Sequence, residues 1–248
     1  MSTDYDENLV AEQYRRAKEQ PWRSQIETYS LMKLIGDPSG KKVIDIACGE
    51  GYFTRLLRRA GAAEVVGIDI SHRMIELARA HEAADPLGIE YRIGDAGAIV
   101  PQQDFDLAVS AWLLANVRER TELARICRGL ACRLRPGGRF VTLTTNPDVY
   151  FFDPAPDYRK YGFAMTLADH VYEGAPILWT LDLGDSELKI ENYYLPPSAY
   201  AEALRNAGFH DVAIHLPELA PGAQGGDNSD YWADFMNAPM MILIDGVT

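Results

Sequence analysis

The sequence predicts a doubly wound α/β fold, and three observations support this prediction. Between Lys41 and about Thr145, short runs rich in β-branched residues alternate with amphipathic segments at helical spacing. Glycine-rich and acidic positions directly follow several of these apolar runs. The length of 248 residues suits one large domain. Strands that alternate with helices form a parallel sheet covered on both faces, which is the expected core.

The first half of this core contains two strand–helix units. Lys42–Ala47 is predicted to be a strand, and the helix Tyr52–Arg59 follows it after a Cys-Gly-Glu-Gly segment. Glu64–Asp69 is the second predicted strand. Ser71 stands at the N-cap position ahead of the helix Met74–His81, because a serine oxygen can accept from the first free amides.

The second half of the core is predicted to contain three strands and one helix. Ile89–Ile93 and Phe105–Val109 read as the third and fourth strands. Apolar residues recur at helical spacing between Thr121 and Leu134. The run Pro136-Gly-Gly138 is expected to stop this helix, and Arg139–Thr144 is expected to form the fifth strand.

A small antiparallel insertion is predicted to interrupt the core after residue 147. Asp148–Leu195 is too long for an unstructured loop in a compact domain. Apolar residues alternate with polar ones from Trp179 to Leu183 and again from Leu188 to Tyr194, on either side of Gly184-Asp185. This pattern indicates a β-hairpin packed over one end of the sheet.

The remaining segments complete one domain with four parts. A helix is expected at Pro197–Ala207, with strands at Val212–Leu216 and Met240–Asp245, and Glu7–Gly36 reads as mostly helical with a break at Pro21. The predicted parts are an N-terminal helical lid (1–36), a ligand-binding core (37–147), a β insertion that caps the substrate (148–195) and the C-terminal part of the sheet (196–248).

Composition and charge restrict the expected partners. The formal net charge is −12, which disfavours binding to phosphate backbones and anionic lipids, so we expect neither a nucleic-acid nor a membrane partner. The first seven residues are acidic and lack the apolar core of a signal peptide. Cys48, Cys127 and Cys132 have no metal or disulfide spacing, so reduced thiols, a cytoplasmic location and no metal are expected. The chain is expected to be a monomer or homodimer.

Four groups of residues follow the predicted strands and are expected to form a ligand site. In open α/β sheets, ligands bind beyond the carboxyl ends of the strands. The groups are Asp45–Gly51 after the first strand, Asp69 after the second, Gly94-Asp-Ala96 after the third and Ser110-Ala-Trp-Leu113 after the fourth. Glycines allow close backbone approach to a ligand, and a carboxylate at the end of the second strand can accept from two ribose hydroxyls.

Together these groups resemble the class I S-adenosylmethionine (SAM)-dependent methyltransferases, which have a Rossmann-like sheet. Val43-Ile-Asp-Ile-Ala-Cys-Gly-Glu-Gly51 resembles their first motif, Val66-Gly-Ile-Asp69 their acidic motif and Gly94-Asp-Ala96 their adenine motif. Leu134-Arg-Pro-Gly-Gly-Arg-Phe140 and Ala207-Gly-Phe-His-Asp-Val212 are similar to two late motifs. The resemblance implies that SAM is the cofactor and S-adenosylhomocysteine (SAH) the product.

The same resemblance implies roles for individual residues. Asp69 would bind the ribose, Asp45 would order the glycine-rich loop, and Asp95 would accept from the adenine amine. The cofactor-binding residues implied in this way, or expected from their position, are Tyr14, Trp22, Arg23, Asp45, Ala47, Gly49, Gly51, Asp69, Ile70, Met74, Gly94, Asp95, Ala96 and Ala111. An ordinary surface ion pair is an equally good interpretation of Arg23.

The flanking segments resemble the toxoflavin synthase-type methyltransferases. The segments concerned are Ala11–Arg23, Asp157–Phe163, Gly174–Trp179 and Asp230–Phe235. This similarity implies N-methylation of a planar azapteridine (a pyrimidotriazinedione) in secondary metabolism, and therefore a small heteroaromatic substrate.

The sequence shows no clear catalytic base, which suits a substrate whose ring N–H is already acidic. Transfer from a sulfonium depends mainly on the position of the acceptor, and Trp112, Trp179, Tyr194 and Trp232 are the candidate positioning residues because aromatic faces stack flat rings. His170 and His215 are the candidate bases, although a lone histidine is more often structural.

Three alternatives remain open from sequence. A small-molecule O-methyltransferase and a non-catalytic SAM-binding protein would carry the same cofactor motifs. A nicotinamide-dependent oxidoreductase would share Gly49-x-Gly51 and Asp69, but its fingerprint requires a third glycine where Thr54 stands.

Overall fold

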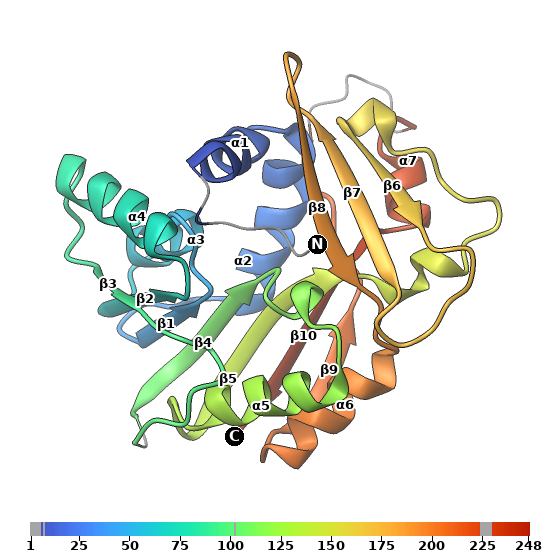
Figure 1. The fold of residues 1–248 in the computed structure, drawn as a ribbon. Helices are drawn as coiled ribbons and strands as arrows, with labels where there is room; N and C mark the ends of the chain where they lie inside the picture. Colours follow the sequence, from blue (N-terminus) through green and yellow to red (C-terminus); the bar gives the residue numbers. More distant parts are fainter. Residues whose placement is uncertain (1–5, 7, 102, 224–229) are drawn as a thin grey trace.

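The larger of two sheets in the protein has seven strands, shown in Figure 1. The computed structural model describes residues 6, 8–101, 103–223 and 230–248; most of the acidic N-terminal heptapeptide lies outside this range. The strand order is β3-β2-β1-β4-β5-β10-β9. The bounds are β1 Lys42–Ile46, β2 Glu64–Asp69, β3 Glu90–Ile93, β4 Phe105–Ala111, β5 Leu134–Thr145, β9 His210–His215 and β10 Met241–Val247. Strands β1 to β5 pair in parallel, whereas β10 is antiparallel to both neighbours.

Helices cover both faces of this sheet, as the doubly wound prediction requires. Val43 of β1 packs with α2, α3 and α4 on one face, and the next residue, Ile44, packs with α5 and α6 on the other. This alternation follows from the two-residue period of a strand. The bounds are α2 Tyr29–Ile35, α3 Tyr52–Arg59, α4 His72–Ala84, α5 Arg120–Ala131 and α6 Pro197–Asn206. The predicted α/β core is confirmed.

One predicted boundary is wrong. Helix α5 ends at Ala131, and Pro136-Gly137-Gly138 lies inside β5 rather than stopping the helix. In the pairing of β4 with β5, Phe105 lies opposite Leu134, and Leu107, two residues later, lies opposite Arg139. The register therefore shifts, and residues 135–138 form a bulge that places the proline outside the regular ladder.

The second sheet is the predicted antiparallel insertion. It has the order β6-β7-β8, with β6 Phe163–Leu167, β7 Pro176–Asp182 and β8 Glu187–Tyr193. The turn between β7 and β8 contains Gly184 at a φ of 85°, where the predicted Gly-Asp hairpin lies. The hydroxyl of Thr145, the last residue of β5, donates to Asn192 of β8 at 3.1 Å, which fixes the small sheet over the carboxyl end of the large one.

The N-terminal segment is helical, as expected. Helix α1 spans Asn8–Ala17, and the wider π-helical turn η1 spans Arg23–Thr28. The chain leaves the helical path at residues 18–20, and Pro21 opens the next helical stretch, where its missing N–H costs nothing. Helix α1 lies between α4 and β8 above the carboxyl ends of the central strands (Figure 1).

The remaining elements are short. They are the 3-10 turns η2 Leu114–Asn116, η3 Pro147–Tyr150 and η4 Arg159–Tyr161, and the helix α7 Ala233–Asn237.

Within the described ranges, none of the helices has the length and apolar character needed to span a bilayer. The same residues contain no group of three or more His, Cys, Asp or Glu side chains arranged to hold a metal ion. The four-part division of the chain stays a prediction.

Candidate functional site

A cleft lies at the carboxyl ends of β1, β2 and β4, where the strand order reverses. Its volume is about 260 Å³, close to the lower end of the range of roughly 300–1,000 Å³ that small-molecule pockets occupy. It is lined by Tyr14, Ala47, Gly49, Asp69, Ile70, Met74, Ala111, Trp112, Leu113, Asn116, Glu191 and Tyr193. The structure therefore brings together seven of the predicted cofactor residues and one predicted positioning residue.

The glycine-rich loop after β1 supplies the backbone wall of this cleft. Ala47, Gly49 and Gly51 have φ values of 59°, 56° and 90°, so the chain turns sharply through three left-handed residues. Nothing lies within 4 Å of the position that a Cβ would take at Gly49. The loop therefore leaves open space where a ligand can approach its backbone. Gly51 itself is the N-cap residue, directly before α3, and does not line the cleft.

Asp69 ties this loop to the end of β2. One carboxylate oxygen accepts from the Gly49 amide at 2.8 Å, and the other accepts from the Ser71 amide at 2.9 Å. Burial raises the pKa of Asp69 above its ordinary value, although both amide hydrogen bonds oppose the shift. Each oxygen has a second lone pair, and the residue lines the cleft, so the carboxylate can accept from two ligand hydroxyls. The residues present thus fit a bound nucleoside.

Ile70 and Met74 supply apolar surface beside Asp69. The side chain of Ile70 is 70% exposed although it is large and apolar, and it faces the cleft. The Ser71 hydroxyl accepts from the Met74 amide, as the N-cap prediction requires, so α4 begins here and holds Met74 against the same space. Exposed apolar surface inside a cleft is suited to a flat ring such as adenine.

Asp45 supports the loop from beneath and lies outside the cleft. It accepts a hydrogen bond from the Thr54 hydroxyl at 2.6 Å. Burial raises the pKa of Asp45 to about 7 despite this hydrogen bond. Thr54, which stands where a dinucleotide fingerprint requires glycine, is therefore used to hold a carboxyl group in the core.

Asp45→Asn is expected to flatten the pH dependence of stability. Between the ordinary value of 3.8 and about 7, the folded protein holds a proton on Asp45 that the unfolded chain has lost. The free energy of unfolding therefore falls as the pH rises through this window, by on the order of 4 kcal/mol at most. An asparagine cannot ionise and lacks this decline. Urea unfolding of both proteins at about pH 4.5 and about pH 7.5 measures it; equal declines would contradict the assignment.

The predicted adenine motif lies next to the cleft but does not line it. The Gly94 amide donates to the Asp69 carbonyl at 2.9 Å. The Asp95 carboxylate accepts from Arg125 at 2.5 Å and from the Gly97 amide at 2.8 Å. Burial opposes ionisation of Asp95, but Arg125 holds the pKa of this carboxyl below its ordinary value. Ala96 is buried in the core. The adenine-binding roles of these residues stay predictions.

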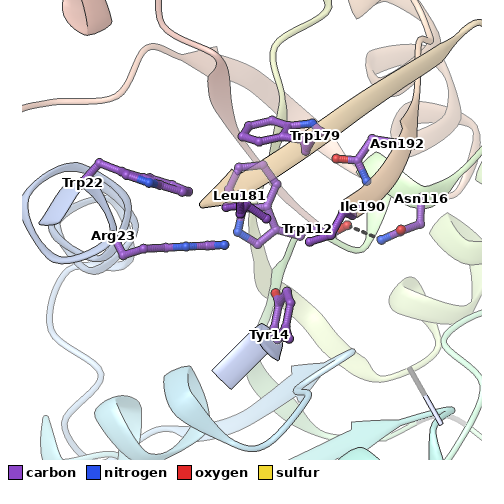
Figure 2. Close-up of a pocket in the computed structure, with 9 residues that line it drawn as sticks. All are labelled: Tyr14, Trp22, Arg23, Trp112, Asn116, Trp179, Leu181, Ile190 and Asn192. Atoms are coloured by element: carbon purple, nitrogen blue, oxygen red, sulfur yellow. Dashed lines mark hydrogen bonds between the residues drawn. The ribbon is translucent and has the colours of Figure 1, made fainter. Parts of the chain in front are cut away.

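A second, smaller cavity adjoins the cleft and is lined mainly by aromatic side chains. We call it the aromatic chamber; its volume is about 20 Å³, which is room for about one water molecule. It is lined by Tyr14, Trp22, Arg23, Trp112, Asn116, Trp179, Leu181, Ile190 and Asn192 (Figure 2). Tyr14, Trp112 and Asn116 line both cavities, so the two spaces meet at these side chains.

Trp112 stands at this junction in an unusual conformation. Its φ is 68°, in the left-handed region that a bulky residue rarely adopts, which indicates local backbone strain where the two cavities meet. Its indole ring meets the rings of Trp22 and Trp179 edge to face, with centroids 6.4 and 5.6 Å away. The Asn116 amide donates to its carbonyl at 2.8 Å.

Glu27 holds this arrangement and was missed by the sequence analysis. Its side chain is 1% exposed, and it accepts from Arg23 Nη1 at 3.0 and 3.2 Å and from the indole nitrogen of Trp112. Arg23 is therefore in a buried pair, and the alternative of a surface ion pair is wrong. The four-residue spacing of Arg23 and Glu27 was the available signal.

The other predicted residues lie elsewhere. Tyr194 packs edge to face on Tyr150, and Trp232 stacks on Tyr161 at 5.2 Å in a neighbouring core; neither lines the cleft or the chamber. His170 is exposed. His215 lies on β9, and its Nε2 is 2.8 Å from the Asp245 carboxylate of β10. The positioning roles of Tyr194 and Trp232 stay predictions.

Three further cleft residues were not predicted: Asn116, Glu191 and Tyr193. The Tyr193 hydroxyl donates to Glu191 at 2.5 Å, and burial with this contact raises the pKa of Tyr193 to about 12. Glu191 and Tyr193 belong to β8 of the insertion, and they reach the cleft only because the small sheet packs on the large one.

Comparisons with known proteins agree with this geometry. A family model described as "Methyltransferase domain" matches residues 43–138. The chain is 28% identical to N-demethylindolmycin N-methyltransferase of Streptomyces griseus, over 88% of this chain and 92% of that protein. It is 30% identical to a ubiquinone biosynthesis O-methyltransferase of Bordetella bronchiseptica, over 78% of this chain and 72% of that protein. An S-adenosylmethionine-dependent methyltransferase structure from Mesorhizobium loti has the same fold, with a TM-score of 0.64, 24% identity and coverage of 94% of this chain and 100% of that one.

Proposed function

Because the chain belongs to the class I SAM-dependent methyltransferases, we propose that it methylates a ring nitrogen of a small planar heterocycle, of the toxoflavin type, in secondary metabolism. SAM is the cofactor. The observation that carries the proposal is the pair of aromatic side chains, Tyr14 and Trp112, that line the cleft where the aromatic chamber adjoins it. Aromatic faces of this kind stack flat rings.

The protein's part in this reaction is to hold two ligands in contact. The glycine-rich loop, Asp69, Ile70 and Met74 would hold the cofactor, which supplies an electrophilic methyl group when bound. Glu27 fixes the indole of Trp112 by a hydrogen bond, so that the wall shared by the two cavities is rigid. Correct positioning of an acceptor can contribute up to roughly 7–11 kcal/mol to lowering a barrier, and no strong base is required where the ring N–H is acidic.

N-methylation is supported further by the relative from Streptomyces griseus, whose printed name is that of an N-methyltransferase and which aligns over most of both chains. The Bordetella relatives are named as O-methyltransferases, so oxygen is the competing acceptor atom. The test is mass spectrometry of the purified protein with SAM and a doubly demethylated toxoflavin precursor, following SAH release and the mass of the heterocycle. Stepwise gain of methyl groups with matching SAH supports the proposal. SAH binding without product would contradict it.

Trp112→Ala is expected to reduce methyl transfer far more than cofactor binding. Loss of the indole removes the wall between cleft and chamber, so the acceptor is misplaced, and the turnover rate should fall roughly tenfold or more. SAH affinity should change little, because Asp69 and the loop remain. Single-turnover rates and calorimetry with SAH measure the two effects, with Trp112→Phe as the matched control. Equal losses in both would place Trp112 in the cofactor site.

A further inference from the structure

One part of the cleft wall comes from the insertion and not from the large sheet. Glu191 and Tyr193 line the cleft from β8, which packs on α1 and η2. They are two residues apart on one strand, so both side chains leave the same face of the small sheet. The residues that fit the cofactor, from the glycine-rich loop to Met74, come from the large sheet and α4. The insertion therefore supplies a wall that is available to the methyl acceptor.

A hydrogen bond fixes the carboxylate of Glu191 at this wall. The Tyr193 hydroxyl donates to Oε1 of Glu191 at 2.5 Å, and both side chains are half-buried. Burial, together with this contact, raises the pKa of Tyr193 to about 12, so the hydroxyl keeps its proton at neutral pH and stays a donor. A carboxylate has about four lone pairs, and one hydrogen bond uses only part of this capacity. Glu191 can therefore also accept a hydrogen bond from a ligand.

The charges and donors around Glu191 favour a ligand that donates to it. The indole N–H of Trp112 is committed to Glu27, and the Tyr193 hydroxyl is committed to Glu191. The described residues that line the cleft include no Lys, Arg or His; the Arg118 guanidinium, 5.6 Å from the ring centroid of Tyr193, is not among them. A phenolate or carboxylate acceptor would meet a like charge at this wall, whereas an N–H group would meet a hydrogen-bond acceptor.

We propose that Glu191 accepts a hydrogen bond from the N–H group of the methyl acceptor and takes its proton during transfer, and that Tyr193 positions the carboxylate for this role. The inference rests on the proposed function, because it requires an acceptor nitrogen that carries hydrogen. Neither His170 nor His215, the candidate bases from the sequence, lines the cleft.

The proton and electron pairs balance in this step. An Oε atom of Glu191 takes the proton, and the electron pair of the N–H bond stays on the acceptor nitrogen. The nitrogen forms its bond to the methyl carbon, and the electron pair of the carbon–sulfur bond stays on sulfur. Glu191 thus offsets the positive charge that the nitrogen would otherwise gain. A carboxylate is a weak base, which suffices for an acidic ring N–H.

Glu191→Gln tests the inference, because it keeps the shape of the side chain and an oxygen that can accept from Tyr193 but removes the negative charge. The protein saturated with SAH is titrated with benzimidazole, which carries a ring N–H, and with benzoxazole, in which oxygen replaces that N–H. Benzimidazole should bind the variant roughly five- to tenfold more weakly, since hydrogen bonds to charged groups are the stronger ones. Affinity for benzoxazole should not fall, and SAH affinity should stay within about twofold of the native value.

Two further variants separate the role of Glu191 from a merely structural one. Tyr193→Phe keeps the ring and removes the hydroxyl that fixes the carboxylate, so it should show the same selective loss for benzimidazole, of roughly two- to fivefold. Glu187→Gln is the matched control, since it makes the same change at an exposed glutamate of the same strand, outside the cleft. It should leave the affinities for SAH and both probes unchanged.

Four results would each overturn the inference. In Glu191→Gln they are equal weakening of benzimidazole and benzoxazole, an unchanged affinity for benzimidazole, or a loss of SAH affinity, which would place Glu191 at the cofactor. The fourth is the absence of benzimidazole binding by the native protein.

Single-turnover methyl transfer to the demethylated toxoflavin precursor separates this inference from the proposed function. If Glu191 determines the affinity for benzimidazole but the precursor gains no methyl group, recognition of N–H by Glu191 stands and the proposed function fails. If the precursor is methylated and Glu191→Gln leaves the rate unchanged, the proposed function stands and this inference fails. A rate lowered roughly a hundredfold, as the loss of a general base predicts, supports both.

Discussion

Asp69→Ala is expected to weaken SAH binding at least tenfold. In the folded protein the carboxylate accepts from the amides of Gly49 and Ser71, and its remaining lone pairs face the cleft. Alanine removes the acceptors for the ribose hydroxyls and also releases the glycine-rich loop from β2. A tenfold loss corresponds to about 1.4 kcal/mol, a modest value for hydrogen bonds to a charged group.

Calorimetry with SAH measures this effect, and two variants serve as controls. Asp69→Asn keeps one acceptor oxygen and should show an intermediate loss. Asp37→Ala removes an exposed aspartate that accepts from the Ser39 amide, away from the cleft, and should leave binding unchanged. Unchanged affinity in a folded Asp69→Ala protein would contradict the cofactor site described above.

Gly129→Ala is expected to destabilise the protein, although helix propensity alone predicts the opposite. Gly129 lies in α5, where alanine is normally about 1 kcal/mol more favourable than glycine. A Cβ at this position would stand 2.2 Å from the carbonyl oxygen of Ala96 and 2.9 Å from Cα of Gly97. Both are backbone atoms of the loop after β3 and cannot swing aside, so overpacking of about 1–3 kcal/mol should exceed the gain in propensity.

Urea unfolding measures the sign of this effect, and Arg128→Ala, on the exposed side of the same helix, is the control. The Arg128 variant should change the free energy of unfolding by less than about 0.5 kcal/mol. SAH affinity of the Gly129 variant should also fall, because the displaced loop is hydrogen-bonded through Gly94 to the Asp69 backbone. A more stable Gly129→Ala protein would show that the loop accommodates the methyl group.

The sequence was sufficient for the elements whose signals are local. The bounds predicted for α3 and β2 match the structure, because an unbroken apolar pattern and strong flanking signals define them. Pro136 was misplaced because its bulge depends on the register between β4 and β5, which joins residues about 30 apart. The same limit applies to the site. Ala47, Gly49 and Asp69 could be placed together because parallel strands end at one edge of a sheet.

The local pattern by itself determined the α/β class, the order of strands and helices, and the group of residues at the carboxyl edge of the sheet. Only the tertiary structure decided which aromatic side chains line the two cavities: Trp179 lines the aromatic chamber, and Trp232 lines neither. It also decided that Glu27 accepts a hydrogen bond from Trp112. The physical reason is that these contacts arise when the N-terminal helices and the small sheet dock on the core. Docking depends on burial and shape summed over distant segments, and no spacing along the chain records it.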